Sequence, residues 1–113
     1  MKIVSVDPFY LKMPEINDAA DGTQDTFVVR VRTDNGIEGW GESDASPLVC
    51  MAAYCCPMSH GNIINIRESL LGETVETPED IVRLHAKSIR NGLDIQQIHN
   101  AYAAADLALW DIV

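Results

Sequence analysis

Residues 98–113 read Ile98-His99-Asn100-Ala101-Tyr102-Ala103-Ala104-Ala105-Asp106-Leu107-Ala108-Leu109-Trp110-Asp111-Ile112-Val113. Apolar residues recur through this stretch at the i, i+3, i+4, i+7 spacing of a helix, and Ile98, Tyr102, Ala105 and Leu109 form one row. The opposite side is apolar as well, because it carries Leu107 and Trp110. A helix that is apolar all round is buried on more than one side. We therefore expect one row to pack on the rest of this chain and the other side to dock elsewhere.

The apolar pattern continues to Val113 without the Gly or Asn that commonly ends a helix. We expect residues 1–113 to be one N-terminal domain, with helix 98–113 leading into a second domain that this chain does not include. Asp94 can cap the start of this helix.

Composition places the chain among globular proteins, with 47% hydrophobic and 22% charged residues. The 17 acidic residues exceed the 8 basic ones and give a formal charge of −9, which disfavours binding to nucleic acid or an anionic membrane. No apolar run reaches the ~18 residues of a membrane helix, and the N-terminus has no signal-peptide core. Three cysteines, with Cys55 and Cys56 adjacent, do not suit a disulfide framework, so we expect a cytoplasmic protein.

Three strands are expected in the first part of the chain, over residues 2–13, 26–33 and 37–43. The middle one alternates clearly, with Phe27, Val29, Val31 and Thr33 on one face. Pro8 marks a bulge or bend in the first strand, which is expected to be an edge strand. A two-residue turn at Asn35-Gly36 would set Val31 opposite Trp40. Gly39 and Gly41 weaken the third strand, so either a close backbone approach or the stems of Arg30 and Arg32 must require them.

Helices are expected after the strands. Ser46-Pro47 starts a short one that Pro57 stops, with Leu48, Met51, Ala52 and Cys55 at helical spacing. A second runs over 63–71 and a third over 78–91, where Thr77-Pro78-Glu79-Asp80 is a strong start signal. The expected fold is α+β: a three-stranded antiparallel meander followed by about four helices.

Few side chains have a spacing that suggests a catalytic or metal-binding site. Cys50, Cys55, Cys56 and His60 lack the usual zinc-ligand spacing, and the cysteines lie in an apolar stretch, so core packing is the preferred interpretation. Asp106 and Asp111 point in different directions on their helix and are expected to bond a neighbouring backbone or an Arg. No phosphate loop and no Ser/His/Asp triad is present. We expect no catalytic residue and no metal ligand in this chain.

Two segments resemble a known family. Gly36-Ile37-Glu38-Gly39-Trp40-Gly41-Glu42 resembles the G-x-x-G-W-G-E strand of the enolase superfamily, in its mandelate racemase/muconate lactonizing enzyme branch. Ala105-Asp106-Leu107-Ala108-Leu109-Trp110-Asp111-Ile112 resembles the A-x-x-A-L-W-D-I segment with which that branch enters its barrel. The opening residues from Met1 to Pro14 also fit, and the resemblance covers essentially the whole chain.

The resemblance implies an N-terminal capping domain attached to a modified TIM barrel. In such enzymes the barrel carries the Mg²⁺ ligands and the bases that remove a proton alpha to a substrate carboxylate. The capping domain contributes two loops that close over the barrel mouth and set substrate choice. Here these loops would be residues 15–25 and 44–62. The magnesium, the catalytic groups and a C-terminal barrel partner would all lie outside residues 1–113.

The expected function is therefore the specificity lid of a Mg²⁺-dependent acid-sugar dehydratase or racemase, with a small carboxylate substrate and a homo-oligomeric full-length enzyme. Polar residues in the two loops are the substrate-binding candidates: Thr23, Gln24, Tyr54, Ser59 and His60. The alternative is a non-catalytic interaction module that docks through its last helix.

Overall fold

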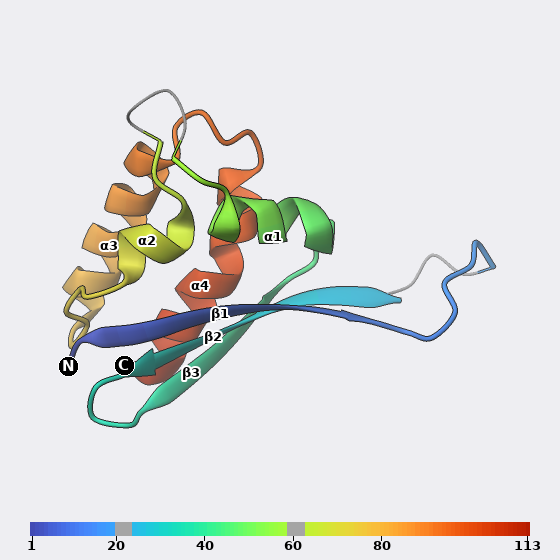
Figure 1. Cartoon of the computed structure of the whole chain (residues 1–113). Helices are drawn as coiled ribbons and strands as arrows, with labels where there is room; N and C mark the ends of the chain where they lie inside the picture. The colour runs from blue at the N-terminus through green and yellow to red at the C-terminus, as the bar shows by residue number, and fades with distance from the viewer. Residues whose placement is uncertain (20–23, 59–62) are drawn as a thin grey trace.

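The computed structural model describes residues 1–19, 24–58 and 63–113. Strands β1 (Ile3–Lys12), β2 (Asp25–Thr33) and β3 (Glu38–Ser43) form an antiparallel sheet in the order β1-β2-β3. Helices α1 (Pro47–Cys55), α2 (Ile66–Leu70), α3 (Pro78–Asn91) and α4 (Ile98–Ile112) follow (Figure 1). The predicted α+β meander with four helices is confirmed.

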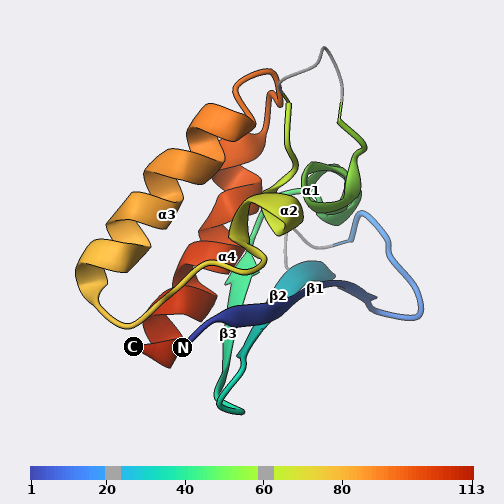
Figure 2. The same ribbon diagram turned by 60° about the vertical axis from the view of Figure 1, so that its left-hand side comes forward.

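The helices gather on one side of the sheet, and α4 lies along β3 (Figure 2). The core forms between them, because the alternating residues Phe27, Val29 and Val31 of β2 are fully buried against the buried row of α4. Tyr102 and Leu109 of that row are also buried, as the helical spacing predicts. None of the helices in the described part of the chain has the length and apolar character needed to cross a membrane.

The irregularity in β1 lies at a different position from the predicted one. Pro8 pairs regularly with Val29, whereas the register shifts between Ile3 and Ser5. The predicted edge position of β1 is confirmed, but the predicted bulge or bend at Pro8 is wrong, because a proline at a sheet edge can keep the regular pairing when its missing N–H would face away from the neighbouring strand. The extra residue is Val4, and the bulge there keeps both Ile3 and Val6 in the core.

The β2–β3 hairpin has a three-residue loop and not the predicted two-residue turn. Arg30 pairs with Trp40 and Val31 pairs with Gly39, one residue away from the predicted register. The Gly36 amide donates to the carbonyl of Thr33 at 3.1 Å, and Gly36 has φ of +86°. A turn followed by a left-handed glycine is the usual three-residue hairpin. The Asn-Gly pair predicted the hairpin correctly but not its loop length.

Gly39 and Gly41 allow α4 to touch β3 with its backbone. A Cβ atom on Gly39 would lie 2.1 Å from the carbonyl oxygen of Ala108, and one on Gly41 would lie 2.0 Å from that of Ala104. Both distances are far below any real contact of a Cβ atom. Of the two reasons that the sequence offered, close backbone approach is therefore the one observed.

The outer face of the sheet carries a layered aromatic and cationic group. The guanidinium carbon of Arg30 lies 5.5 Å from the ring centroids of both Phe9 and Trp40. Arg30 also donates through Nε and Nη2 to Asp7 at 3.2 and 3.1 Å. The side chains of Phe9, Arg30 and Trp40, one from each strand, therefore contact one another across the outer face of the sheet.

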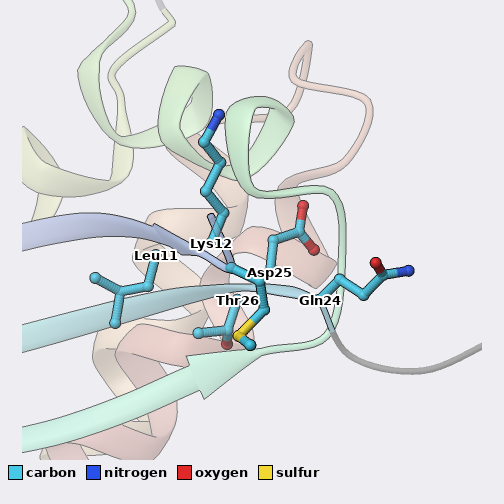
Figure 3. A pocket seen from close by; sticks show the side chains of 6 residues that line it. Leu11, Lys12, Gln24, Asp25 and Thr26 are labelled. Carbon is cyan, nitrogen blue, oxygen red and sulfur yellow. The ribbon is translucent and has the colours of Figure 1, made fainter. Parts of the chain in front are cut away.

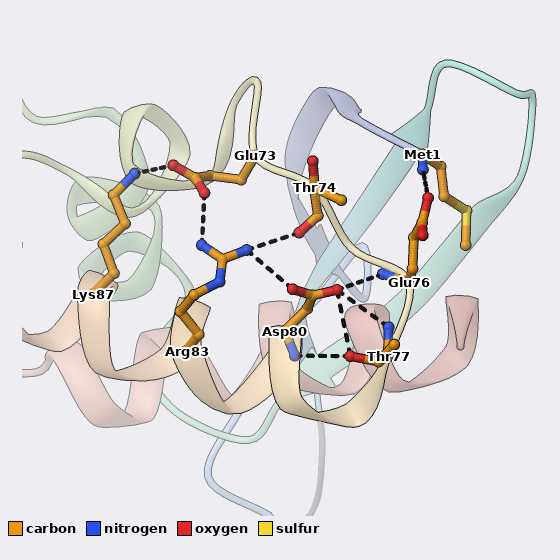
Figure 4. Close-up of polar contacts among 8 residues, drawn as sticks. All are labelled: Met1, Glu73, Thr74, Glu76, Thr77, Asp80, Arg83 and Lys87. Atoms are coloured by element: carbon orange, nitrogen blue, oxygen red, sulfur yellow. Dashed lines mark hydrogen bonds and ion pairs between the residues drawn. The ribbon is translucent and has the colours of Figure 1, made fainter.

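Polar contacts hold the start of α3 (Figure 4). The Thr77 hydroxyl accepts from the Asp80 amide, and the Asp80 carboxylate accepts from the amides of Thr77 and Glu76, which forms a capping box. Arg83 and Lys87 both donate to Glu73. The helix bounds 78–91 were predicted correctly because its cap signal is dense.

The other helices differ from prediction in detail. α1 buries Cys50, Ala53 and Tyr54, while Leu48 is 64% exposed, so the buried face is not the one that its most apolar residues outline. α4 begins after Gln97, so Gln97 occupies the N-cap position and the predicted cap residue, Asp94, lies three residues before it. Turns through Gly92 and Ile95 occupy the intervening residues.

Candidate functional site

The first predicted loop is stabilised by Gln24. Its side-chain oxygen accepts from the Asn17 amide at 2.8 Å, and its side-chain nitrogen donates to the Asn17 carbonyl at 2.6 Å. The Met13 amide donates to the Gln24 carbonyl at 2.7 Å. Gln24 therefore shapes the segment that follows β1, and this is the role the geometry supports for it. Thr23 lies outside the described residues.

A shallow cavity of about 260 Å³ lies at the base of this loop (Figure 3). Lys12 and Asp25 extend on one side of the β1–β2 ribbon, whereas Leu11 and Thr26 lie on the other. Leu11 is 52% exposed, so the ribbon presents apolar surface to solvent close to the predicted lid.

Tyr54 occupies the core and not the predicted lid. Its side chain is fully buried and lies 5.2 Å from Phe27, centroid to centroid. Its hydroxyl donates to the Ala101 carbonyl at 2.7 Å and accepts from the Ala105 amide at 3.2 Å. Burial raises the pKa of this phenol well above its ordinary value. We therefore do not propose Tyr54 as a substrate ligand, because its hydroxyl already forms hydrogen bonds that connect α1 to α4.

The second predicted loop is described only in part. Ser59 and His60 lie outside the described residues, so their assignment stays a prediction. Cys50 is buried, and this burial raises the pKa of its thiol, whereas Cys55 is exposed. Within residues 1–19, 24–58 and 63–113, no three His, Cys, Asp or Glu side chains are grouped closely enough to hold a metal ion.

Asp111 joins the two sequence segments that carry the family resemblance. Its Oδ2 atom accepts from the backbone amide of Trp40 at 2.9 Å, which covers an amide at the free edge of β3. The structural role expected for this carboxylate, bonding a neighbouring backbone, is thus what the structure shows. Asp106 lies half-exposed near Tyr102, and its charge raises the pKa of that buried phenol, for which burial itself is the larger cause.

An exposed apolar surface remains beside this bond. Leu107 is 50% exposed and Trp110 is 46% exposed, as expected for the side of α4 opposite its buried row. Trp40 of β3, 43% exposed, lines the same groove as these two residues. Trp40 and Glu42 were not predicted to be part of this surface, because the incorrect hairpin register placed Trp40 opposite the buried Val31.

Comparisons with known proteins agree with these features. The family model for the mandelate racemase / muconate lactonizing enzyme N-terminal domain matches residues 4–113. The structure of a predicted mandelate racemase from Rhodobacter sphaeroides has 45% sequence identity and a TM-score of 0.91, over 98% of this chain and 28% of that chain. A search among curated proteins found no match.

Further solved structures share the fold. A mandelate racemase/muconate lactonizing protein from Paracoccus denitrificans PD1222, complexed with magnesium, is 25% identical with a TM-score of 0.68, over 96% of this chain and 26% of that one. The 3,6-anhydro-D-galactonate cycloisomerase from Zobellia galactanivorans is 24% identical with a TM-score of 0.73, over 99% of this chain and 28% of that one, and supports the fold alone. The chain therefore spans about 28% of the length of the first of these structures. The chain belongs to the mandelate racemase/muconate lactonizing enzyme N-terminal domain family of the enolase superfamily.

Proposed function

We propose that this chain is the capping domain of a Mg²⁺-dependent enzyme that removes a proton alpha to a carboxylate, as an acid-sugar dehydratase or a racemase. The observation that carries the proposal is the family match over residues 4–113, together with 45% identity to a protein described as a predicted mandelate racemase. The substrate would be a small carboxylate, and the enzyme would act in the cytoplasm as a homo-oligomer.

A C-terminal barrel of the same protein would supply the chemistry. No group of described residues in this chain suits a metal ion, so we assign none of them to magnesium. When bound in the barrel, magnesium would stabilise the negative charge that develops on the substrate carboxylate. The role of this chain would be to dock on the barrel and to position two loops over the mouth of the barrel.

Support for docking comes from α4. Leu107 and Trp110 are about half exposed on a helix whose other side is the centre of the core. Exposed apolar patches of this kind mark protein interaction sites. Gln24 supports the lid role indirectly, because its bonds to Asn17 give the first loop a defined shape.

The test uses the full-length gene product with Mg²⁺ and a panel of sugar acids in D₂O. We expect deuterium at the carbon alpha to the carboxylate of at least one substrate, and a lower kcat/KM for His60→Ala with an unchanged Tm. Losing one hydrogen bond to a substrate costs about 0.5–1.5 kcal/mol. Residues 1–113 alone should give no exchange. Exchange by this chain alone, or none by the full-length protein, would contradict the proposal.

The second candidate is a non-catalytic module that docks through α4 onto a different chain. The same exposed residues, Leu107 and Trp110, favour it. The sequence that follows Val113 in the gene discriminates between the two, because only the first candidate requires repeated β/α units there.

A further inference from the structure

A groove of about 610 Å³ runs between the edge of β3 and the exposed side of α4. Trp40, Glu42, Leu107, Trp110 and Asp111 line it, with Val28 of the neighbouring strand. It thus combines two indole rings, one aliphatic side chain and two carboxylates, and no Lys or Arg side chain lines it.

The carboxylates of the groove have unused acceptor atoms. Glu42 accepts from the Thr26 hydroxyl with Oε2 at 3.3 Å, and Asp111 accepts from the Trp40 amide with Oδ2. Within the described part of the chain, neither forms a salt bridge, and the second oxygen of each has no hydrogen-bond partner. The groove is therefore negatively charged.

The two indole rings are not equivalent. One face of Trp40 already meets Arg30, whose charge is paired with Asp7. Trp110 has no ring or cation contact among the described residues. The face of an indole ring attracts a cation, and Arg or Lys contacts of this kind are common in proteins. Trp110 next to free carboxylate oxygens therefore suits a cationic side chain.

We infer that this groove receives an apolar segment of the barrel domain that carries one Arg or Lys side chain. The inference rests on the proposed function, which supplies the barrel. A purely apolar occupant would bury the Glu42 and Asp111 carboxylates without partners, which is costly. A second copy of this chain would bring another acidic groove and another net charge of −9. Charge complementarity thus selects a cation-bearing segment.

The test titrates residues 1–113 with N-acetyl-arginine amide and, as its neutral counterpart, N-acetyl-citrulline amide, while NMR follows both indole N–H signals. We expect a saturable shift of the Trp110 signal with the arginine probe at millimolar concentration. The citrulline probe should bind about fivefold more weakly, because it is neutral and can form neither the cation–π contact nor the exposed ion pair.

Variants locate the binding in the groove. Glu42→Gln keeps an acceptor for Thr26 but removes one of the two charges, and it should weaken binding of the arginine probe about twofold while binding of the citrulline probe stays the same. Glu15→Gln, an exposed charge in a distant loop, should leave binding unchanged. Equal binding of both probes, no shift at Trp110, or full binding by Glu42→Gln would overturn the inference.

Two further outcomes separate this inference from the proposed function. Concentration-dependent dimers that Leu107→Asp abolishes would show that a second copy fills the groove, which also overturns the inference. If neither probe binds while the full-length enzyme exchanges alpha protons, only the groove inference fails. If the arginine probe binds but the full-length protein exchanges none, the cation site stands and the proposed function fails.

Discussion

The Cα atom of Gly41 faces the carbonyl oxygen of Ala104 so closely that a Cβ atom there would lie 2.0 Å from this oxygen. Gly39 stands in the same relation to Ala108, at 2.1 Å. The obstructing atoms are backbone, which cannot rotate away as a side chain can. The strand motif 36–42 and the helix motif 105–112 therefore lie side by side in one backbone contact. Each glycine is required because of a residue more than sixty positions away in the sequence.

Gly41→Ala should consequently be strongly destabilising. Overpacking typically costs about 1–3 kcal/mol and occasionally more, and we expect the upper end because α4 must move as a whole. Gly36→Ala is the matched control, because it adds the same methyl group where no atom lies within 4 Å and only the left-handed backbone conformation is strained. That strain costs about 1–2 kcal/mol. Urea unfolding measures both; equal losses would contradict the contact.

The fold was largely predictable because its signals are local. Alternation along β2 and the dense cap at Thr77 each depend on a few neighbouring residues, and both predictions are confirmed. The hairpin register was not, since Asn35-Gly36 suits two-residue and three-residue loops alike. The bulge at Val4 depends on which β1 residues the helices bury, and no local pattern carries that information.

The candidate site was less predictable. Tyr54 is a polar residue in the predicted lid segment 44–62, yet its hydroxyl bonds Ala101 and Ala105 on a helix far along the chain. The groove at Trp40 depends on the observed register, which a two-residue turn misplaces by one residue. By contrast, exposure of Leu107 and Trp110 was predictable, because the helix has more apolar surface than one row can bury.

Tyr54→Phe should lower stability without a direct effect on substrate binding. The change leaves the Ala101 carbonyl without its phenol donor in a buried place, which costs about 1–3 kcal/mol. Tyr10→Phe, at a half-buried residue in the β1 strand, is the control and should change stability little. In the full-length enzyme, a large rise in KM for Tyr54→Phe at unchanged Tm would restore a substrate role for this residue.

Stability should fall at alkaline pH. Burial raises the pKa of both Tyr54 and Tyr102 in the folded chain, above the value of about 10 in an unfolded one. The unfolded state therefore loses these protons first, and the free energy of unfolding decreases as the pH rises above about 10. Urea unfolding at about pH 8 and pH 11 measures the decrease. In Tyr102→Phe the decrease should be smaller; an unaltered dependence on pH would contradict this account.

Stability should also fall in acid, through contacts at the start of α3. Hydrogen bonds from Lys87 and Arg83 lower the pKa of Glu73, and the Glu76 amide lowers that of Asp80. Both carboxylates then stabilise the fold above their unfolded pKa values of about 4, and this contribution is lost as the pH falls below them. Thermal unfolding between about pH 7 and pH 3 tests this. Glu73→Gln should show a smaller acid loss than wild type, whereas Glu68→Gln, at an exposed residue of α2, should match wild type.

Trp110→Ser should lower the stability of the isolated chain much less than that of the full-length protein. In residues 1–113 the side chain is 46% exposed, so its loss should cost only about 1 kcal/mol. Leu109→Ala, one residue away but fully buried, should cost about 2–5 kcal/mol in the same chain.

In the full-length protein the difference between these two effects should narrow, because the proposed barrel would cover Trp110 and Leu107. Burying one such side chain contributes about 1.5–3 kcal/mol, so Trp110→Ser should then approach the cost of a core substitution. Hydrogen exchange gives an independent measure, since docking should slow exchange at the exposed side of α4 beyond its rate in residues 1–113. If Trp110→Ser is as mild in the full-length protein as in the isolated chain, the exposed side of α4 is not the docking surface.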